Sequence, residues 1–125
     1  MKELPEPWAC GDAGGLGHAW RRVLAAAVAA PSIHNTQPWQ FRVRPESVDV
    51  LVDHDRLLTV ADPSGREMVI SVGSAVFNLE VAMSAEGRRP VLRPWPDPSA
   101  PRLVARVGVG AEVTPDETVR ALAAA

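Results

Sequence analysis

The sequence predicts an α+β fold in which a small, mainly antiparallel sheet packs with a long central helix. Two stretches of alternating hydrophobic residues, Trp39 to Val43 and Val48 to Val52, indicate a hairpin of two strands. Between Asp62 and Gly87, hydrophobic residues recur at helical spacing, which indicates the long helix. The 125 residues fit one domain or part of one.

The N-terminal segment, residues 1–17, is expected to be a flexible arm. It contains two prolines and four glycines without any hydrophobic period. A partial domain is then expected over residues 18–125. The alanine-rich stretch from Leu16 to Ala30 predicts a first helix with one apolar face, and Pro31 should end it because proline lacks the backbone N–H that a helix needs.

Composition excludes several classes of function. A net charge of -2 and a pI near 5.9 give no basic footprint for nucleic acid or an anionic membrane. The lone Cys10 cannot form an internal disulfide, so a reducing cytoplasm is expected. The three histidines lack metal-ligand spacing, so no metal is expected. Arg21-Arg22 before an apolar run resembles an export signal, but the acidic residues upstream and the shortness of the run favour a helix.

The long helix has a recognisable start and two distinct faces. Asp62-Pro63-Ser64-Gly65-Arg66-Glu67 supplies a capping oxygen, a proline and an early acid. The residues of its apolar stripe are Met68, Val72, Val76, Leu79 and Met83. A neighbouring face of small residues surrounds Gly73 and Asn78, and Gly73 costs about 1 kcal/mol against alanine. Close approach of another backbone would explain this glycine. Because the face needs cover, either a homodimer through it or poor solubility is expected.

Two further strands and a last helix are expected after Gly87. Val91 to Trp95 and Leu103 to Val109 read as strands separated by a proline-rich loop, which suits a sheet edge. Thr114-Pro115-Asp116-Glu117 resembles a capping box with proline at the first helical position. The chain ends eight residues after Glu117, so a C-terminal truncation is expected.

The polar turn between the first helix and the first strand is the main candidate binding site. Its side chains that can donate or accept hydrogen bonds belong to Ser32, His34, Asn35, Thr36, Gln37 and Trp39. Directed amide and hydroxyl groups of this kind can hold a planar heteroaromatic ligand by its carbonyls and ring nitrogens. They can equally satisfy loose backbone groups at a helix end. Trp39 and Phe41 begin an alternating strand and are expected in the core.

Two segments resemble known proteins. One segment resembles the flavin-contacting segment of the nitroreductase superfamily, and its His-Asn-Thr-Gln sequence resembles the Acg-like branch. This segment is Ala29-Ala30-Pro31-Ser32-Ile33-His34-Asn35-Thr36-Gln37-Pro38-Trp39-Gln40-Phe41. A second segment, Asp62 to Glu67 followed by Ser71 to Leu79, resembles the acid-Pro-x-x-Arg-Glu opening and interface helix of that branch. The resemblance covers roughly residues 20–110 and implies an N-terminal, nitroreductase-like half domain.

The resemblance implies an FMN site between two α+β halves, usually of different subunits. Pro31, Ser32, Ile33, Asn35 and Gln37 are the implied ring contacts. Bound FMN would take hydride from NAD(P)H and reduce nitroaromatic or quinone-type acceptors, with no catalytic residue required from the polypeptide. The partner would be a second copy or a second half-domain.

One part of the family pattern is missing. Nitroreductases hold the flavin phosphate with an arginine-rich segment, and the paired arginines of this sequence, Arg21-Arg22 and Arg88-Arg89, do not match it. In the Acg-like branch that clamp belongs to the second half of the chain. The alternative function is therefore a non-catalytic protein that binds or sequesters flavin, or a truncated interaction protein that dimerises through its interface helix.

Overall fold

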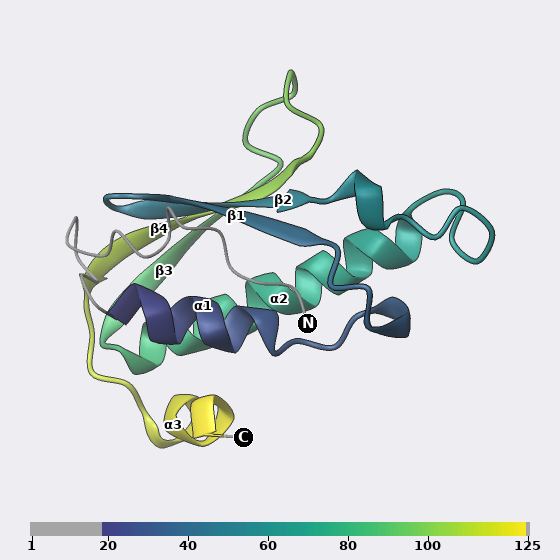
Figure 1. Ribbon diagram of the computed structural model, residues 1–125. Coiled ribbons are helices and arrows are strands. Elements are labelled where there is room, and N and C mark those ends of the chain that lie inside the picture. Colours follow the sequence, from purple (N-terminus) through teal and green to yellow (C-terminus); the bar gives the residue numbers. More distant parts are fainter. Residues whose placement is uncertain (1–18, 125) are drawn as a thin grey trace.

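A four-stranded antiparallel sheet forms one layer of the protein, and two helices pack side by side beneath it (Figure 1). The structure is a computed structural model that describes residues 19–124. Its elements are α1 (Trp20–Val28), β1 (Trp39–Arg44), β2 (Ser47–Val52), α2 (Arg66–Ala85), β3 (Arg88–Pro94), β4 (Leu103–Glu112) and α3 (Glu117–Ala124). The α+β class predicted from the sequence is confirmed.

The strand order of the sheet is β1-β2-β4-β3. The predicted hairpin is confirmed: β1 pairs antiparallel with β2, and Phe41 lies opposite Val50. Both expected C-terminal strands are present, and β3 forms a sheet edge. Pro90 and Pro94 both lie in β3, where an edge position tolerates their missing N–H groups.

The core lies between the sheet and the α1–α2 pair. All five residues of the predicted apolar stripe of α2 are buried, as are Trp39 and Phe41 of β1. The Asp62 carboxylate accepts hydrogen bonds from the backbone N–H groups of Glu67 and Met68 at 3.1 and 2.9 Å, so it satisfies the first turn of α2 as expected. Gly87 ends the helix region with a φ of 84°, a conformation that favours glycine.

One helix start differs from the sequence prediction, and another lies outside the described residues. The described part of α1 begins at Trp20 after Ala19; the expected start at Leu16 and the arm over residues 1–17 fall outside the described residues. The last helix begins later than predicted. Asp116 Oδ1 accepts the Val119 backbone N–H at 2.8 Å, so Asp116 rather than Thr114 is the N-cap. Its carboxylate lies three residues before that N–H, the spacing that an N-cap requires.

The small-residue face of α2 was interpreted wrongly as one uncovered surface. Ala75 and Ala82 are buried within the chain, and the Asn78 amide donates to the Ala26 carbonyl of α1 at 3.1 Å. Gly73 lies on a different, exposed side, and a Cβ added there would meet nothing within 4 Å. The expected close approach of a backbone to Gly73 therefore does not occur within the described chain.

By length and composition alone, α2 could cross a membrane. It is the one such helix among the described residues, and 44% of its apolar window is buried. Core helices of soluble proteins pass the same test, and the stripe of α2 that packs under the sheet fits a core helix.

Candidate functional site

The segment from Pro31 to Trp39 leaves α1 and enters β1 through an irregular turn (Figure 1). Three residues other than glycine adopt left-handed backbone conformations here: His34, Asn35 and Gln37, with φ values of 46°, 55° and 49°. Such conformations cost energy for residues with a Cβ and persist when surrounding contacts impose them. The turn is therefore a built, strained segment and not a relaxed connection.

Hydrogen bonds between its own residues hold the turn. The Gln37 backbone N–H donates to Ser32 Oγ at 3.0 Å, and the Asn35 N–H donates to the Ser32 carbonyl at 3.1 Å. The Gln37 side-chain amide donates to Asn35 Oδ1 at 3.2 Å. Ser32, Asn35 and Gln37 thus form one connected network. These three residues therefore satisfy backbone and side-chain groups of the turn itself, which is the alternative to ligand binding that the sequence left open.

The predicted site residues differ in exposure. Pro31 and Asn35 are exposed, Ser32 is half-buried, and Gln37 is buried. The backbone of Ile33 begins the 3-10 turn Ile33–Asn35. The exposed Asn35 amide and the half-buried Ser32 hydroxyl can face a ligand, whereas the buried Gln37 amide braces the turn from inside.

Arg56 also supports the turn, and sequence reasoning missed it. It lies in the 3-10 turn His54–Arg56 after β2, and its Nη1 donates to the Thr36 carbonyl at 3.0 Å. Its Nε lies 3.6 Å from Asp53 Oδ2, and the Asp53 N–H donates to the Pro38 carbonyl at 2.8 Å. Only the i, i+3 spacing of Asp53 and Arg56 could have signalled this link from the sequence.

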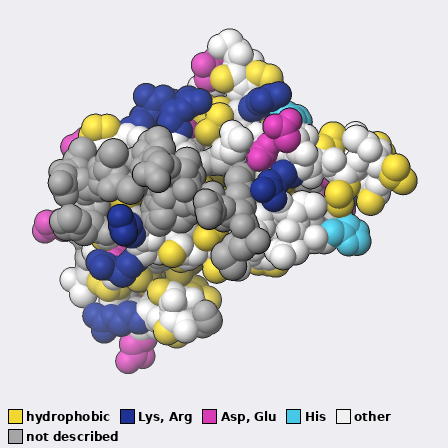
Figure 2. Space-filling view, viewed as in Figure 1, with side chains coloured by type: hydrophobic (Ala, Val, Ile, Leu, Met, Phe, Trp, Pro, Cys, Tyr) yellow, Lys and Arg dark blue, Asp and Glu magenta, His cyan; other side chains and the backbone are white. Residues whose placement is uncertain are grey.

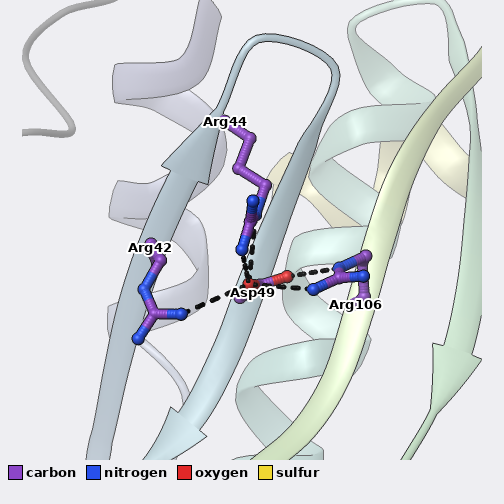
Figure 3. Close-up of polar contacts among 4 residues, drawn as sticks. All are labelled: Arg42, Arg44, Asp49 and Arg106. Carbon is purple, nitrogen blue, oxygen red and sulfur yellow. Dashed lines mark hydrogen bonds and ion pairs between the residues drawn. The ribbon is translucent and has the colours of Figure 1, made fainter. Parts of the chain in front are cut away.

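A second polar cluster lies on the outer side of the sheet and was also missed (Figure 3). The Asp49 carboxylate of β2 is wholly buried. Arg106 Nε reaches it at 2.6 Å and Arg44 Nη2 at 3.0 Å, while Arg42 lies at 3.8 Å. Basic side chains gather over the sheet on the side away from α1 and α2 (Figure 2).

The electrostatics of this cluster are those of a structural ion-pair network. Burial opposes the charged form of Asp49, but hydrogen bonds from Arg106 and Arg44 outweigh it and hold the pKa of Asp49 below its ordinary value. The alternation of Arg42 and Arg44 with the buried residues of β1 was the available sequence signal. It could not reveal that Asp49 lies opposite Arg42 on one side and Arg106 on the other.

The hydrogen bonds that the structure describes for the paired arginines go to residues outside the turn. Arg22 Nε donates to Glu86 Oε1 at 2.6 Å, beside the C-terminal end of α2. Arg88 Nε donates to the Gly110 carbonyl at 2.9 Å. Within residues 19–124, no group of three or more histidine, cysteine, aspartate or glutamate residues could hold a metal ion.

Comparison with known proteins gives consistent results in sequence and in structure. No family model matches the chain. It is 43% identical over 105 residues to "Putative NAD(P)H nitroreductase Rv3131" of Mycobacterium tuberculosis, which takes in 84% of this chain and 30% of the relative. It is 36% identical over 87 residues to "Putative NAD(P)H nitroreductase acg" of the same organism, over 70% of this chain and 26% of the relative. The chain thus spans less than a third of each relative's length.

Solved structures share the fold. A nitroreductase-like crystal structure from Desulfovibrio desulfuricans, described as a complex with FMN, has a TM-score of 0.65 at 19% identity, covering 85% of this chain and 80% of that one. The crystal structure of a "Putative NADH Oxidase" from Clostridium acetobutylicum has a TM-score of 0.65 at 15% identity, covering 86% of this chain and 87% of that one. At these identities the likeness concerns the fold, and it confirms the nitroreductase-like half domain expected from the sequence.

Proposed function

We propose that the Pro31–Trp39 turn of this chain, which belongs to the nitroreductase superfamily and resembles its Acg-like branch, binds the isoalloxazine ring of FMN. The chain would then supply one half of a flavin oxidoreductase site. A second α+β half, from another copy or another half-domain, would complete it.

The strained turn is the observation that supports this proposal most. Left-handed conformations at His34, Asn35 and Gln37 occur within four residues, and contacts from Ser32 and Arg56 hold them in place. Backbone strain of this kind concentrates at ligand sites because the surrounding structure must maintain it. A connection that merely joined α1 to β1 would not need three such residues.

The donors of the turn fit a flavin ring. Asn35 Oδ1 accepts from Gln37, which leaves the Asn35 Nδ2 group with two N–H donors on an exposed side chain. Ser32 Oγ accepts from the Gln37 N–H, and its own O–H can donate outward. Two fixed donors can bond the carbonyls and ring nitrogens of the isoalloxazine. The buried Gln37 would position Asn35 and would not contact the ring.

In this proposal bound FMN would supply hydride transfer from NAD(P)H to a nitroaromatic or quinone-type acceptor. The chain's own residues would orient the ring, and none would need to exchange a proton. We place this activity in the cytoplasm, where the single cysteine of the sequence would stay reduced.

The first experiment measures FMN binding by quenching of flavin fluorescence. The wild-type chain should bind, and Asn35→Ala should weaken binding by about 1–3 kcal/mol because one ring hydrogen bond is lost. Gln40→Ala changes an exposed residue of β1 outside the turn and serves as the matched control. Unchanged affinity in a folded Asn35→Ala protein would remove Asn35 from the site.

A second candidate is flavin binding without turnover. The described bonds of Arg22 and Arg88 commit these arginines to Glu86 and to the Gly110 carbonyl, away from the turn. A chain that holds the ring without a phosphate clamp would sequester flavin weakly. Bleaching of the bound flavin by NADH or NADPH would favour the oxidoreductase, and binding without bleaching would favour this alternative.

A further inference from the structure

A row of charged residues crosses the outer side of the sheet from one edge strand to the other. Arg42 of β1 lies opposite Asp49 of β2, and Asp49 lies opposite Arg106 of β4. Arg106 in turn lies opposite Arg93 of β3. Residues directly opposite on neighbouring antiparallel strands point to the same side of a sheet, so these four side chains share one face. Because strands lie about 4.8 Å apart, the row is about 14 Å long.

The carboxylate in this row lies beneath the guanidinium groups that surround it. The side chain of Asp49 is 0% exposed, whereas those of Arg42, Arg44 and Arg106 are 60%, 46% and 34% exposed. The three arginines converge on the carboxylate from the two strands that flank β2 (Figure 3). This face therefore presents positive charge to solvent, although the formal net charge of the whole chain is -2.

Asp49 fixes the orientation of two of these arginines and leaves part of their donors unused. Arg44 and Arg106 each donate to it through Nε and Nη2, at distances of 2.6–3.3 Å. A guanidinium group carries five N–H donors, so the Nη1 group of each arginine remains for a ligand. Arg42 Nη1 lies 3.8 Å from Asp49 Oδ2, beyond hydrogen-bond distance, so its donors are also uncommitted. Groups that are held in place before a ligand arrives lower the entropic cost of binding it.

Arg93 extends the positive charge toward the β3 edge without a counter-charge of its own. It makes no ion pair with residues 19–124, and like charges directly opposite each other, such as Arg93 and Arg106, destabilise a sheet. The pKa of Arg106 is raised, mainly by its hydrogen bond with Asp49 and to a lesser degree by the charge of Asp97 in the β3–β4 loop. Within the same residues, no ion pair joins Asp97 to either arginine. An anion bound between Arg93 and Arg106 would remove the repulsion.

We propose that this arginine row is an oxyanion site whose ligand is a small molecule bearing a diphosphate group. One phosphoryl group lies over Asp49 against Arg42, Arg44 and Arg106, and the other lies between Arg106 and Arg93. Guanidinium groups bind phosphoryl oxygens through paired N–H donors. The charges converge on one point, whereas a nucleic acid backbone is followed by an extended basic groove. The Pro31–Trp39 turn lies level with the helices, beneath the sheet, so the two sites are separate (Figure 1).

Isothermal titration calorimetry of the purified chain with inorganic pyrophosphate, at constant ionic strength, tests the site. Pyrophosphate should bind at one equivalent, and more tightly than inorganic phosphate, because only the longer anion reaches Arg93. Arg42→Gln and Arg93→Gln should each raise the dissociation constant roughly tenfold, since each removes charge-assisted hydrogen bonds. Arg21→Gln, at an exposed position of α1, removes the same charge from the helix layer and should have no effect. A wild-type chain without saturable pyrophosphate binding overturns the proposal.

Asp49→Asn distinguishes an organised site from a merely basic surface. The substitution adds one positive charge to the face but weakens the contacts that orient Arg44 and Arg106. In an organised site the affinity for pyrophosphate falls several-fold despite the added charge, and circular dichroism at neutral pH verifies that the variant is folded. On a surface that attracts anions by charge alone, the affinity rises. Equal or higher affinity in a folded Asp49→Asn protein therefore overturns the proposal.

Two competition experiments exclude other ligands of the same chemistry. A single-stranded oligonucleotide that binds more tightly with increasing length and with a steep salt dependence would assign the face to a nucleic acid backbone instead. Pyrophosphate should displace neither riboflavin nor FMN from the turn. Displacement of FMN but not of riboflavin would show that the row holds the flavin phosphate, and a separate site would be wrong. Pyrophosphate binding by a chain that ignores flavin would sink the proposed function and keep the oxyanion site.

Discussion

The Pro31–Trp39 turn and the Asp49 cluster are both dense in polar groups, yet they use them differently. In the cluster, arginines of β1 and β4 converge on one buried carboxylate of β2 and so link the three strands. In the turn, a few hydrogen bonds, one of them from Arg56, brace a strained backbone, and Asn35 remains exposed. We therefore infer the candidate site from backbone strain and exposed polar groups and not from charge density.

The largest expected effect is on stability, at Asp49. Asp49→Ala removes charge-assisted hydrogen bonds from Arg106 and Arg44, and we expect the free energy of unfolding to fall by about 2–3 kcal/mol. Urea denaturation measures this loss. Flavin affinity of the folded variant should not change. A large loss of flavin affinity would show that the two regions are coupled.

Acidification should also lower the free energy of unfolding through the Asp49 cluster. The pKa of Asp49 is lowered in the folded protein, so its stabilisation is full above the ordinary value of about 3.9 and declines as the pH falls through the folded-state pKa. We expect Asp49→Asn to lose this part of the acid sensitivity. The pKa of Glu86 is also lowered, through its hydrogen bond with Arg22. Both proteins contain Glu86, so its contribution to the pH dependence cancels when their stabilities are compared. If the unfolding free energies of the wild type and of Asp49→Asn fall in parallel as the pH is lowered, this acid sensitivity does not come from Asp49.

Ser32 should contribute less to stability but more to binding. Ser32→Ala removes the acceptor of the Gln37 N–H, and we expect a loss of about 1 kcal/mol in unfolding free energy together with weaker flavin binding. Ser99→Ala removes a hydroxyl bound to Asp97 in the exposed β3–β4 loop and is the control for binding. Equal flavin affinities for both variants would indicate that Ser32 has only a structural role.

The smallest expected effect is a gain in the free energy of unfolding. His34 has a φ of 46° and an exposed side chain, so His34→Gly should relieve strain and stabilise the protein by about 0.5–1 kcal/mol. Thermal unfolding with His54→Gly as the comparison would measure it, because His54 lies in an ordinary 3-10 turn. A destabilised His34→Gly protein would mean that the turn is not strained at this residue.

Residue patterns predicted most of the fold because its elements follow local periodicity. The stripe from Met68 to Met83 and the alternation of Trp39 and Phe41 both correspond to buried faces. The start of α3 was misplaced because Thr114 and Asp116 are both competent caps, and only the backbone path selects Asp116. Sequence spacing also could not show which side of α2 the first helix covers.

The motif indicated the candidate site, but neither its support by Arg56 nor the separate Asp49 cluster could be predicted. Arg56 reaches the Thr36 carbonyl from a segment 20 residues away, and Arg106 reaches Asp49 across 57 residues. Such contacts depend on strand register and on how the chain returns to the sheet. No local pattern encodes them, so a single sequence indicates the groups but not their partners.

The central claim is that this chain holds the flavin ring through its turn and not the flavin phosphate. Parallel titrations of the purified chain with riboflavin and with FMN test it directly, because the two ligands share the ring and differ in the phosphate. We expect the two dissociation constants to agree within about threefold, which is less than 1 kcal/mol. Binding of FMN but not riboflavin, or of neither ligand, would contradict the claim.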